Sequence, residues 1–527
     1  MTRDAPAAPT APLRGLPAAA ALALVFAVVA LWLFTRHNNF AFFYHSDESA
    51  KVEQVLTGTY NFHHPMLLLS ATELWLRGGG GEATQQQTVE AGRFVSAVFS
   101  ALAIGAFSLL GFVRSGWLAA VAVGLLLTCH QQLFELAHYM KEDPALLVGM
   151  ALTFLALACY QRRPSWVTAA GCGMACGVAI SGKYLGVVVL ICALPVLMQA
   201  RGLRRGERFA HLGVLLAGAL AVLVVANLPL LRDLATFRAS FDREMEFVVD
   251  GSKGMTRRVP HTVYLNIFAD NTTPMIWLLL AVYYVRFWQT RREHDALAWV
   301  LALFPLVLTL VFSFSPKTND RYYLPVTATF YYLAALALAE LPHVMPQRWR
   351  GLAGMRGPAP RVAALLIAAA WEAPRLLEVY RAFQHDDRRE LAELIRTTLP
   401  AEVRIAQDSR VMLPDRRNRE RGKVIVDLPQ QVVSGPRYAS DLGDLDQLRA
   451  AGFTHVAVTE SSYGRFFLNS MKAKEEYRDE HARHRTFYER LDKEGTLLFD
   501  RPRGTVIYLH PGLRLYQIAT ETPPTRS

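Results

Sequence analysis

The segment GLPAAAALALVFAVVALWLF, residues 15–34, contains no charged side chain. A helix of about 20 apolar residues is long enough to cross the ~30 Å hydrocarbon core of a bilayer. No convincing small-residue cleavage site follows the segment, so we expect a retained first span rather than a signal peptide. Apolar runs of this kind recur to about residue 380, about eleven in all. The sequence therefore predicts a polytopic α-helical membrane protein.

The overall composition agrees with this prediction. Hydrophobic residues make up 52% of the 527 residues, and the mean hydropathy is +0.18, which is too apolar for an ordinary soluble enzyme. A net charge of +11 could suggest nucleic acid. The basic residues, however, gather in short clusters between apolar runs, as they do in cytoplasmic loops. We therefore expect membrane lipids and no nucleic acid among the partners.

The basic clusters also predict the orientation. If the N-terminus is cytoplasmic, the alternate loops on that side carry these clusters, as the positive-inside rule requires. Ala- and Arg-rich composition suggests a bacterium, so we expect a multi-pass protein of the bacterial inner membrane, with its C-terminal part on the periplasmic side. The basic loops begin at Arg114, Gln161, Arg201, Arg286 and Gln347.

Three regions follow from these patterns. Residues 1–15 are a predicted cytoplasmic tail, residues 16–380 a multi-span transmembrane catalytic domain, and residues 381–527 a small extracytoplasmic α/β domain. In the last region, helix-like DDRRELAELIRTTLP (386–400) and amphipathic DLDQLRAAG (444–452) alternate with β-type runs. These runs are EVRIAQ (402–407), KVIVDL (423–428) and THVAVTE (454–460).

Two acidic pairs are expected at the outer membrane surface. The first, Asp47 and Glu48, follows the first span by about a dozen residues and precedes the histidines of HHP (63–65). The second, Glu142 and Asp143 in YMKEDP, stands where another span begins. Because Pro144 suits the first turn of a helix, Asp143 taken alone is better explained as a helix cap.

Two basic residues occur beside apolar runs on the same predicted side. Lys183 lies in AISGKYLGVVVL, and an ionisable group at membrane depth costs about 2.5 to 3.5 kcal/mol. Such a group faces a polar cavity, has a partner, or extends to the interface. Arg321, in SPKTNDRYYLPV, heads a later span. It could anchor the helix end, but a guanidinium is also well shaped to bind phosphate.

The order and sidedness of these motifs resemble the membrane glycosyltransferases of the GT-C type, in the branch of protein O-mannosyltransferases and aminoarabinose transferases. The resemblance covers roughly the first 380 residues. It rests on the Asp-Glu pair, HHP, GRFVSAVFSAL (92–102), an acid before a later span, SGKYLG (181–186) and DRYYLP (320–325).

The resemblance implies a polyprenyl-phosphate sugar as donor and a lipid, glycan or protein as acceptor in the cell envelope. The enzyme would be a hexosyl or pentosyl transferase. The catalytic residues would be Asp47, Asp143 and Glu48, with Asp47 as the general base and Asp143 assisting it or orienting the acceptor. Lys183 and Arg321 would hold the donor phosphate. Substrate contacts or cavity lining would come from His63, His64, Tyr184 and Tyr322.

The chemistry of such a donor predicts inversion. A phosphate leaving group departs as an anion, which fixed positive charges stabilise. A positioned carboxylate acting on the acceptor hydroxyl typically contributes about 10² to 10⁴-fold. A single displacement on the opposite face then inverts the anomeric carbon without a covalent sugar intermediate.

Other interpretations stay open at the level of sequence. No cofactor is required, although a divalent metal ion is compatible with His64 and Glu48; the spacing of the histidines matches no strong ligand pattern. A transporter or flippase of a lipid-linked substrate is the main alternative function. A membrane-anchored scaffolding subunit is a third. The sequence does not identify the sugar, the prenyl carrier or the acceptor.

Overall fold

The computed structural model describes residues 14–80, 82–250, 255–257, 262–314, 319–344, 358–468 and 471–518. Most of the predicted N-terminal tail and the basic loop at Gln347 lie outside these residues. The chain divides into two compact units. The helical unit consists of Met1–Asn38, Ala50–Val249 and Pro260–Leu377, and the C-terminal unit of Asn39–Ser49, Asp250–Val259 and Glu378–Ser527.

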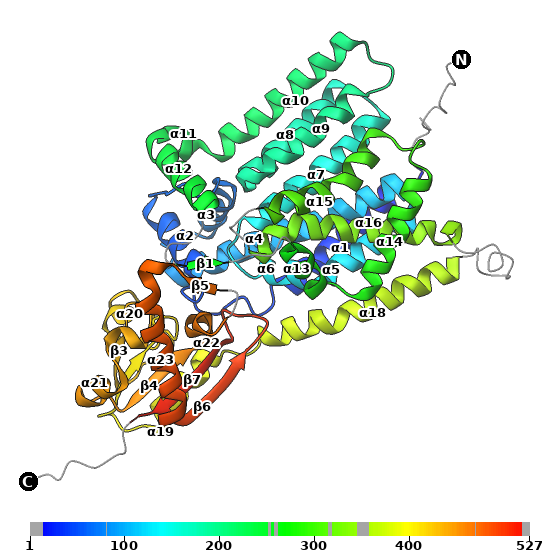
Figure 1. Cartoon of the computed structure of the whole chain (residues 1–527). Coiled ribbons are helices and arrows are strands. Elements are labelled where there is room, and N and C mark those ends of the chain that lie inside the picture. Colours follow the sequence, from blue (N-terminus) through cyan, green and yellow to red (C-terminus); the bar gives the residue numbers. More distant parts are fainter. Residues whose placement is uncertain are drawn as a thin grey trace, which may run out of the picture. The chain divides into compact units, whose positions relative to one another are not determined.

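The helical unit is built almost entirely from α-helices (Figure 1). Two of them, α2 and α18, continue into the C-terminal unit, and α12 ends at the boundary. The elements are α1 Leu16–Phe34, α2 Ser46–Thr57, α3 Leu67–Gly79, α4 Gln85–Ser115, α5 Trp117–Thr128, α6 Gln131–Ala137, α7 Asp143–Arg162, α8 Trp166–Gly182, η1 Tyr184–Gly186, α9 Val187–Met198, α10 Arg205–Ala226, α11 Leu228–Arg232, α12 Leu234–Asp250, α13 Val263–Asn271, α14 Pro274–Gln289, α15 Ala296–Ser313, η2 Asp320–Tyr323, α16 Leu324–Val344 and α18 Pro358–Ala382.

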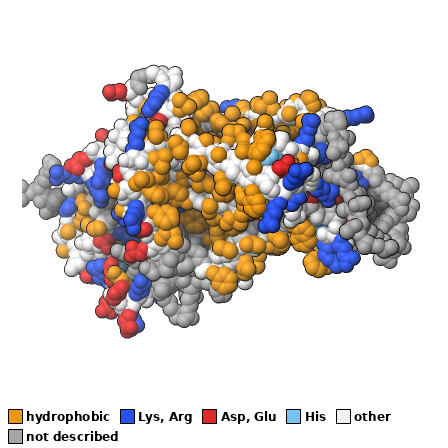
Figure 2. Space-filling model, turned by 90° about the horizontal axis from the view of Figure 1, so that it is seen from above, with side chains coloured by type: hydrophobic (Ala, Val, Ile, Leu, Met, Phe, Trp, Pro, Cys, Tyr) orange, Lys and Arg blue, Asp and Glu red, His pale blue; other side chains and the backbone are white. Residues whose placement is uncertain are grey.

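Several of these helices can cross a membrane. Among the described residues, six are long and apolar enough, and up to eight spans result if each of two bent helix pairs counts as one. The bent pairs are α5 with α6 and α13 with α14. The predicted number of about eleven spans stays unconfirmed. Figure 2 shows hydrophobic side chains over much of one face of the molecule, as expected of a surface in contact with lipid. On α10, the side chains of Leu220 and Val225 are among the exposed hydrophobic ones.

Small residues let the helices approach closely. A Cβ atom at Gly149 of α7 would overlap the backbone of Ala179 on α8, and one at Gly173 of α8 would overlap the carbonyl oxygen of Leu215 on α10. Helices in a bilayer gain no hydrophobic driving force from meeting one another, so close backbone packing at small residues stabilises their association. The Gly- and Ala-rich sequence of α8 therefore fixes it between α7 and α10.

The C-terminal unit contains a five-stranded sheet in the order β3-β2-β4-β7-β6. Strands β2, β3 and β4 are parallel, while β7 runs antiparallel to β4 and to β6. A separate two-stranded antiparallel sheet joins β1 and β5. The strands are β1 Met255–Arg257, β2 Arg404–Gln407, β3 Gln431–Ser434, β4 His455–Thr459, β5 Met471–Ala473, β6 Thr496–Arg503 and β7 Pro511–Gln517.

Both faces of the five-stranded sheet are covered by apolar side chains. Alternate residues of β4 divide between the two cores, with Val456 and Val458 in one and Ala457 in the other. Helices α21 Leu445–Ala450 and α23 Arg478–Glu494 pack on the first face, and α19 Asp387–Thr398 packs on the second. This alternation follows from the two-residue period of a strand, and it gives a three-layer α/β/α domain.

The predicted helix at 386–400 and the predicted strands at 402–407 and 454–460 are confirmed by α19, β2 and β4. The predicted strand at 423–428 is wrong, because these described residues adopt no regular structure. The side chain of Val424 is exposed, and the strand of this region, β3, begins only after Pro429. A proline cannot donate a ladder hydrogen bond, which favours a strand start beyond it.

Candidate functional site: buried ion pairs where membrane spans begin

The N-terminal end of α7 places two carboxylates next to each other. Glu142 is the N-cap residue and Asp143 the first helical residue, with Pro144 directly after it. Both side chains are buried, with relative exposures of 4% and 2%. In the described structure, Glu142 makes no capping hydrogen bond to the backbone of α7. Asp143 is paired with a lysine rather than serving as a cap. Buried carboxylates of this kind need charged partners, and each has one.

Lys183 is the partner of Asp143. It is the C-cap residue of α8 and stands at the break before η1 and α9. Its Nζ atom donates a hydrogen bond of 2.6 Å to Asp143 Oδ1. The ammonium group also lies 4.6 Å from the centre of the Tyr322 ring, and the Arg321 guanidinium lies 5.4 Å from that ring. Arg321 interacts electrostatically with Asp143 as well, so the two predicted phosphate-binding cations meet around one aromatic ring.

Lys51 is the partner of Glu142. Its Nζ atom lies 2.9 Å from Glu142 Oε1 and donates a second hydrogen bond, of 3.0 Å, to the carbonyl oxygen of Met140. Burial by itself would raise the pKa of Glu142, but the surrounding positive charges, among them Lys51 and Lys141, hold this pKa well below its usual range. The carboxylate is therefore ionised at neutral pH.

His64 lies at the edge of this group, with Nε2 3.9 Å from Glu142 Oε2. Burial lowers the pKa of His64 to about 4, although the charge of Glu142 acts in the opposite direction. The imidazole is therefore neutral near pH 7 and can donate or accept a hydrogen bond. Lys51, His64, Glu142, Asp143 and Lys183 together are called the charge cluster below.

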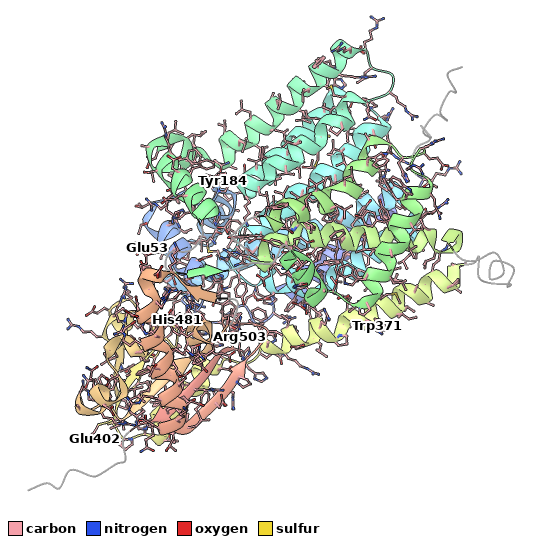
Figure 3. The ribbon with its side chains drawn as sticks, in the orientation of Figure 1. Glu53, Tyr184, Trp371, Glu402, His481 and Arg503 are labelled. Atoms are coloured by element: carbon pink, nitrogen blue, oxygen red, sulfur yellow. The ribbon has the colours of Figure 1, made fainter. Side chains whose placement is uncertain are left out.

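The loop that carries the histidines is tied to the end of α8. Tyr184, labelled in Figure 3, donates a hydrogen bond of 3.0 Å from its hydroxyl to the carbonyl oxygen of Phe62. The side chain of Asn227 accepts from the N–H of Met66 and donates to the hydroxyl of Ser181. These bonds connect segments far apart in sequence, and they hold His64 close to α7 and α8. The backbone N–H of His63 donates a hydrogen bond to the side chain of Asn61.

Asp47 and Glu48 belong to the C-terminal unit. Both lie in the first turn of α2, where Asp47 is half-exposed and Glu48 is buried. The backbone N–H of Asp47 donates to Nδ1 of His45 at 3.1 Å. Lys51 follows Asp47 by one turn of the same helix. The role of Asp47 as general base stays a prediction.

The described residues do not fit a metal site. Nowhere in the described ranges do three or more His, Cys, Asp or Glu side chains come together so that they could hold a metal ion. His64 faces one carboxylate, Glu142, which is already paired with Lys51. Zinc sites in proteins have at least three protein ligands. The predicted use of His64 and Glu48 as ligands therefore gains no support.

Sequence reasoning missed Lys51 and assigned no role to Glu142. A signal was present, because Lys51 follows Asp47 and Glu48 at the four- and three-residue spacings that place side chains on one helix face. Its actual partner, however, is 91 residues away along the chain (142 − 51). The predicted residues Asp143, Lys183, Arg321, His64 and Tyr322 do come together in the helical unit.

Part of the helical unit matches the model of a known protein family. Residues 79–229 match the model of the dolichyl-phosphate-mannose-protein mannosyltransferase family. This segment includes Asp143 and Lys183, two members of the charge cluster. No curated protein sequence gives a significant match.

Solved structures share the fold over nearly the whole chain. The crystal structure of ArnT from Cupriavidus metallidurans bound to undecaprenyl phosphate matches 98% of this chain and 100% of that chain, with a TM-score of 0.51 and 15% identity. The archaeal oligosaccharyltransferase AglB from Archaeoglobus fulgidus, in complex with an inhibitory peptide and a dolichol-phosphate, matches 95% of this chain and 75% of that chain, with a TM-score of 0.52 and 11% identity.

The predicted fold class, a GT-C type helical membrane protein with a small C-terminal α/β domain, is confirmed. The family match and this fold support a membrane glycosyltransferase that uses a polyprenyl-phosphate-linked sugar.

Proposed function

We propose that this chain transfers a hexose or pentose from a polyprenyl phosphate to an acceptor hydroxyl on the extracytoplasmic side of a bacterial inner membrane, with inversion. The family match over residues 79–229 and the GT-C fold support the reaction class. The observation that carries the proposal is the buried Lys183–Asp143 pair, with Arg321 beside it, where membrane-spanning helices begin. Charges at the ends of spans suit a lipid-linked substrate whose tail stays in the bilayer.

Lys183 is the proposed phosphate ligand. An ammonium group has three donors, and Asp143 Oδ1 takes one of them. The other donors can reach a phosphate oxygen while Asp143 and the Tyr322 ring hold the side chain in place. The role that follows for Asp143 is to position Lys183, so that a fixed positive charge is ready for the leaving phosphate.

Asp47 is the proposed base. As the acceptor oxygen attacks the anomeric carbon, its proton passes to the Asp47 carboxylate. The bond between the anomeric carbon and the phosphate oxygen breaks in the same displacement, and polyprenyl phosphate leaves with the electron pair. The half-exposed position of Asp47 at the start of α2 leaves it accessible to an acceptor. A base in this role typically contributes about 10² to 10⁴-fold to the rate.

The test incubates the purified protein with a panel of polyprenyl-phosphate sugars and candidate acceptors. Asp47→Asn should lower transfer by about 10² to 10⁴-fold with normal membrane insertion. Glu53→Gln is the matched control, because Glu53 is an exposed acid on the same helix (Figure 3). Transfer that survives Asp47→Asn unchanged would refute the role of Asp47. A wild-type protein that transfers no sugar from any donor would refute the function.

Membrane orientation is tested separately. Protease added to sealed right-side-out vesicles should reach the C-terminal unit. Cleavage of that unit in inside-out vesicles alone would place it in the cytoplasm and overturn the proposed side of transfer.

A further inference from the structure

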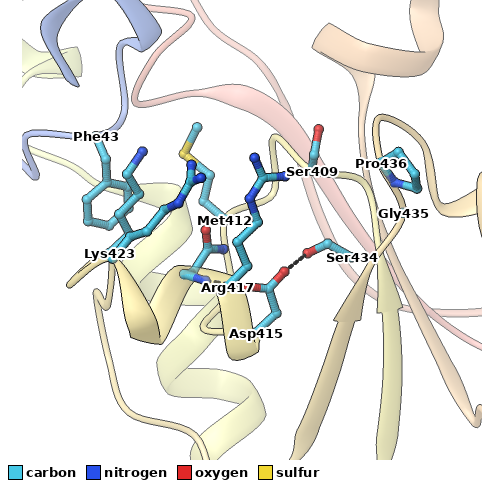
Figure 4. A pocket seen from close by; sticks show the side chains of 11 residues that line it. Phe43, Ser409, Met412, Asp415, Arg417, Lys423, Ser434, Gly435 and Pro436 are labelled. Atoms are coloured by element: carbon cyan, nitrogen blue, oxygen red, sulfur yellow. Dashed lines mark hydrogen bonds between the residues drawn. The ribbon is translucent and has the colours of Figure 1, made fainter. Parts of the chain in front are cut away.

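The C-terminal unit contains a pocket of about 400 Å³ that the proposed transfer reaction does not use. Ligand pockets in proteins typically have about 300 to 1,000 Å³, so this volume suits a small molecule such as a monosaccharide derivative. Every residue that lines the pocket belongs to the C-terminal unit. Figure 4 shows Phe43 and Lys423 on one side of it and Ser409 and Pro436 on the other.

The lining is strongly basic. The lining includes three cationic side chains, Arg417, Arg421 and Lys423, and one carboxylate, Asp415, which gives a net charge of +2 (3 − 1). Asp415 is already occupied, since it accepts hydrogen bonds from the hydroxyl of Ser434 and from the N–H of Asn418. The excess positive charge therefore favours an anion. A single arginine guanidinium can donate hydrogen bonds to two phosphate oxygens at once.

The pocket opens where the parallel strands end. Ser409 follows β2, and Ser434 is the last residue of β3. Ligands of α/β sheets bind outside the carboxyl ends of the strands. Between β2 and β4 this edge is closed by buried Asp408, which accepts from the N–H groups of Ala439 and Thr459. The open space is consequently on the β3 side.

Polar and apolar groups complete the lining. The hydroxyls of Ser409 and Ser434 already donate hydrogen bonds within the protein, and the amide of Asn418 donates one to the carbonyl oxygen of Leu413. The hydroxyl oxygens can still accept from sugar hydroxyls, and the second amide N–H of Asn418 can still donate. Phe43 and Met412 supply apolar surface. Met412 has a φ of 68°, which is uncommon for a residue other than glycine. The next residue, Leu413, donates its N–H to the Gln407 side chain at 2.9 Å, which fixes this conformation.

We propose that this pocket binds a phosphorylated sugar, with the phosphate on Arg417, Arg421 and Lys423 and the sugar ring between Phe43 and the two serines. This phosphorylated sugar would be part of the glycan or glycolipid that serves as acceptor. The binding assignment stands on the pocket alone, whereas the acceptor role rests on the proposed function.

The test is calorimetric titration of the full-length protein in a neutral detergent with glucose 1-phosphate, inorganic phosphate and glucose. Glucose 1-phosphate should bind more tightly than inorganic phosphate, and glucose should not bind. The triple variant Arg417→Gln, Arg421→Gln, Lys423→Gln should lose at least tenfold in affinity. Should its unfolding midpoint fall, the single variant Arg417→Gln should still lose about threefold, as expected for one phosphate contact.

The matched control replaces exposed arginines away from the pocket in the same unit, in the triple variant Arg396→Gln, Arg478→Gln, Arg485→Gln. Each of these pairs with a glutamate three or four residues away along the chain. The control should stay within about twofold of wild type, because the net charge change is identical but the pocket is intact. An equal loss of affinity for glucose 1-phosphate in both triple variants would overturn the proposal. So would wild-type protein that binds no glucose 1-phosphate at millimolar concentration.

Because the titration measures binding without transfer, a failure of the proposed donor site is distinguishable from a failure of this pocket. A further arm separates the sources of phosphate. Doping the micelles with phosphatidylglycerol should not displace the sugar phosphate. Displacement, or inorganic phosphate binding as tightly as glucose 1-phosphate, would assign the pocket to phosphate groups in general and refute the sugar component.

Discussion

The Lys183–Asp143 pair can be tested by a double-mutant cycle. Lys183 Nζ lies 2.6 Å from Asp143 Oδ1, and the side chains of Lys183 and Asp143 are 13% and 2% exposed. Lys183→Met leaves the carboxylate buried without its partner, which costs about 3 to 5 kcal/mol of unfolding free energy. Arg321 is close enough to reduce this cost, so the lower end is expected. Asp143→Asn should cost less, because the lysine ammonium can move toward water.

The double variant should be more stable than the sum of the two changes predicts. With both charges removed, no buried charge is left unpaired, and the coupling energy should be about 2 to 3 kcal/mol. SDS titration in mixed micelles measures the unfolding free energy of the four proteins. Additive effects, within about 0.5 kcal/mol, would refute the view that the two side chains stabilise each other.

Transfer activity separates a structural pair from a functional one. If Lys183 stabilises the leaving phosphate, the double variant should regain stability but remain about 10² to 10³-fold slower, the usual loss when a group that stabilises developing charge is removed. Lys183→Arg keeps the charge and should retain more activity. A double variant that folds and transfers sugar at the wild-type rate would show that the pair only stabilises the fold.

Three further changes test other parts of the structure. Lys51→Met should cost about 3 to 5 kcal/mol by leaving a buried carboxylate unpaired, and SDS titration that shows less than about 1 kcal/mol would contradict this. Gly173→Ala should destabilise the helical unit by overlap with α10, whereas Gly171→Ala, with no described atom within 4 Å of its Cβ position, should be neutral or stabilising in the same assay. Burial raises the pKa of Asp408 from 3.8 to about 6, so the stability of the C-terminal unit should fall as pH rises from about 4 to 6 and then level off. Tyr488→Phe removes a hydrogen bond to this carboxylate and should lower the unfolding free energy by about 1.5 to 3 kcal/mol at pH 7.5 and by less at pH 5. Urea unfolding at the two pH values measures the difference. Equal losses at both would refute the ionisation of Asp408 between them.

Local sequence was sufficient for the elements that depend on local hydropathy. The uncharged run at 15–34 became α1, and the amphipathic segment at 386–400 became α19. Both follow from periodicity within one segment. The run at 423–428 shows the limit, because its β-type residues lie outside the sheet. Strand propensity acts only where neighbouring strands offer a partner.

The composition of the charge cluster depended on the tertiary structure. The sequence alone indicated that Lys183 faces a polar cavity, has a partner or extends to the interface, because an unpaired charge beside an apolar span is costly. It could not identify Asp143, which lies 40 residues earlier and meets Lys183 only because α7 and α8 pack closely at Gly149 and Ala179. Lys51 was missed for the same reason. Hydropathy is a property of one segment, whereas the partner of a buried charge is set by which helix ends the packing brings together.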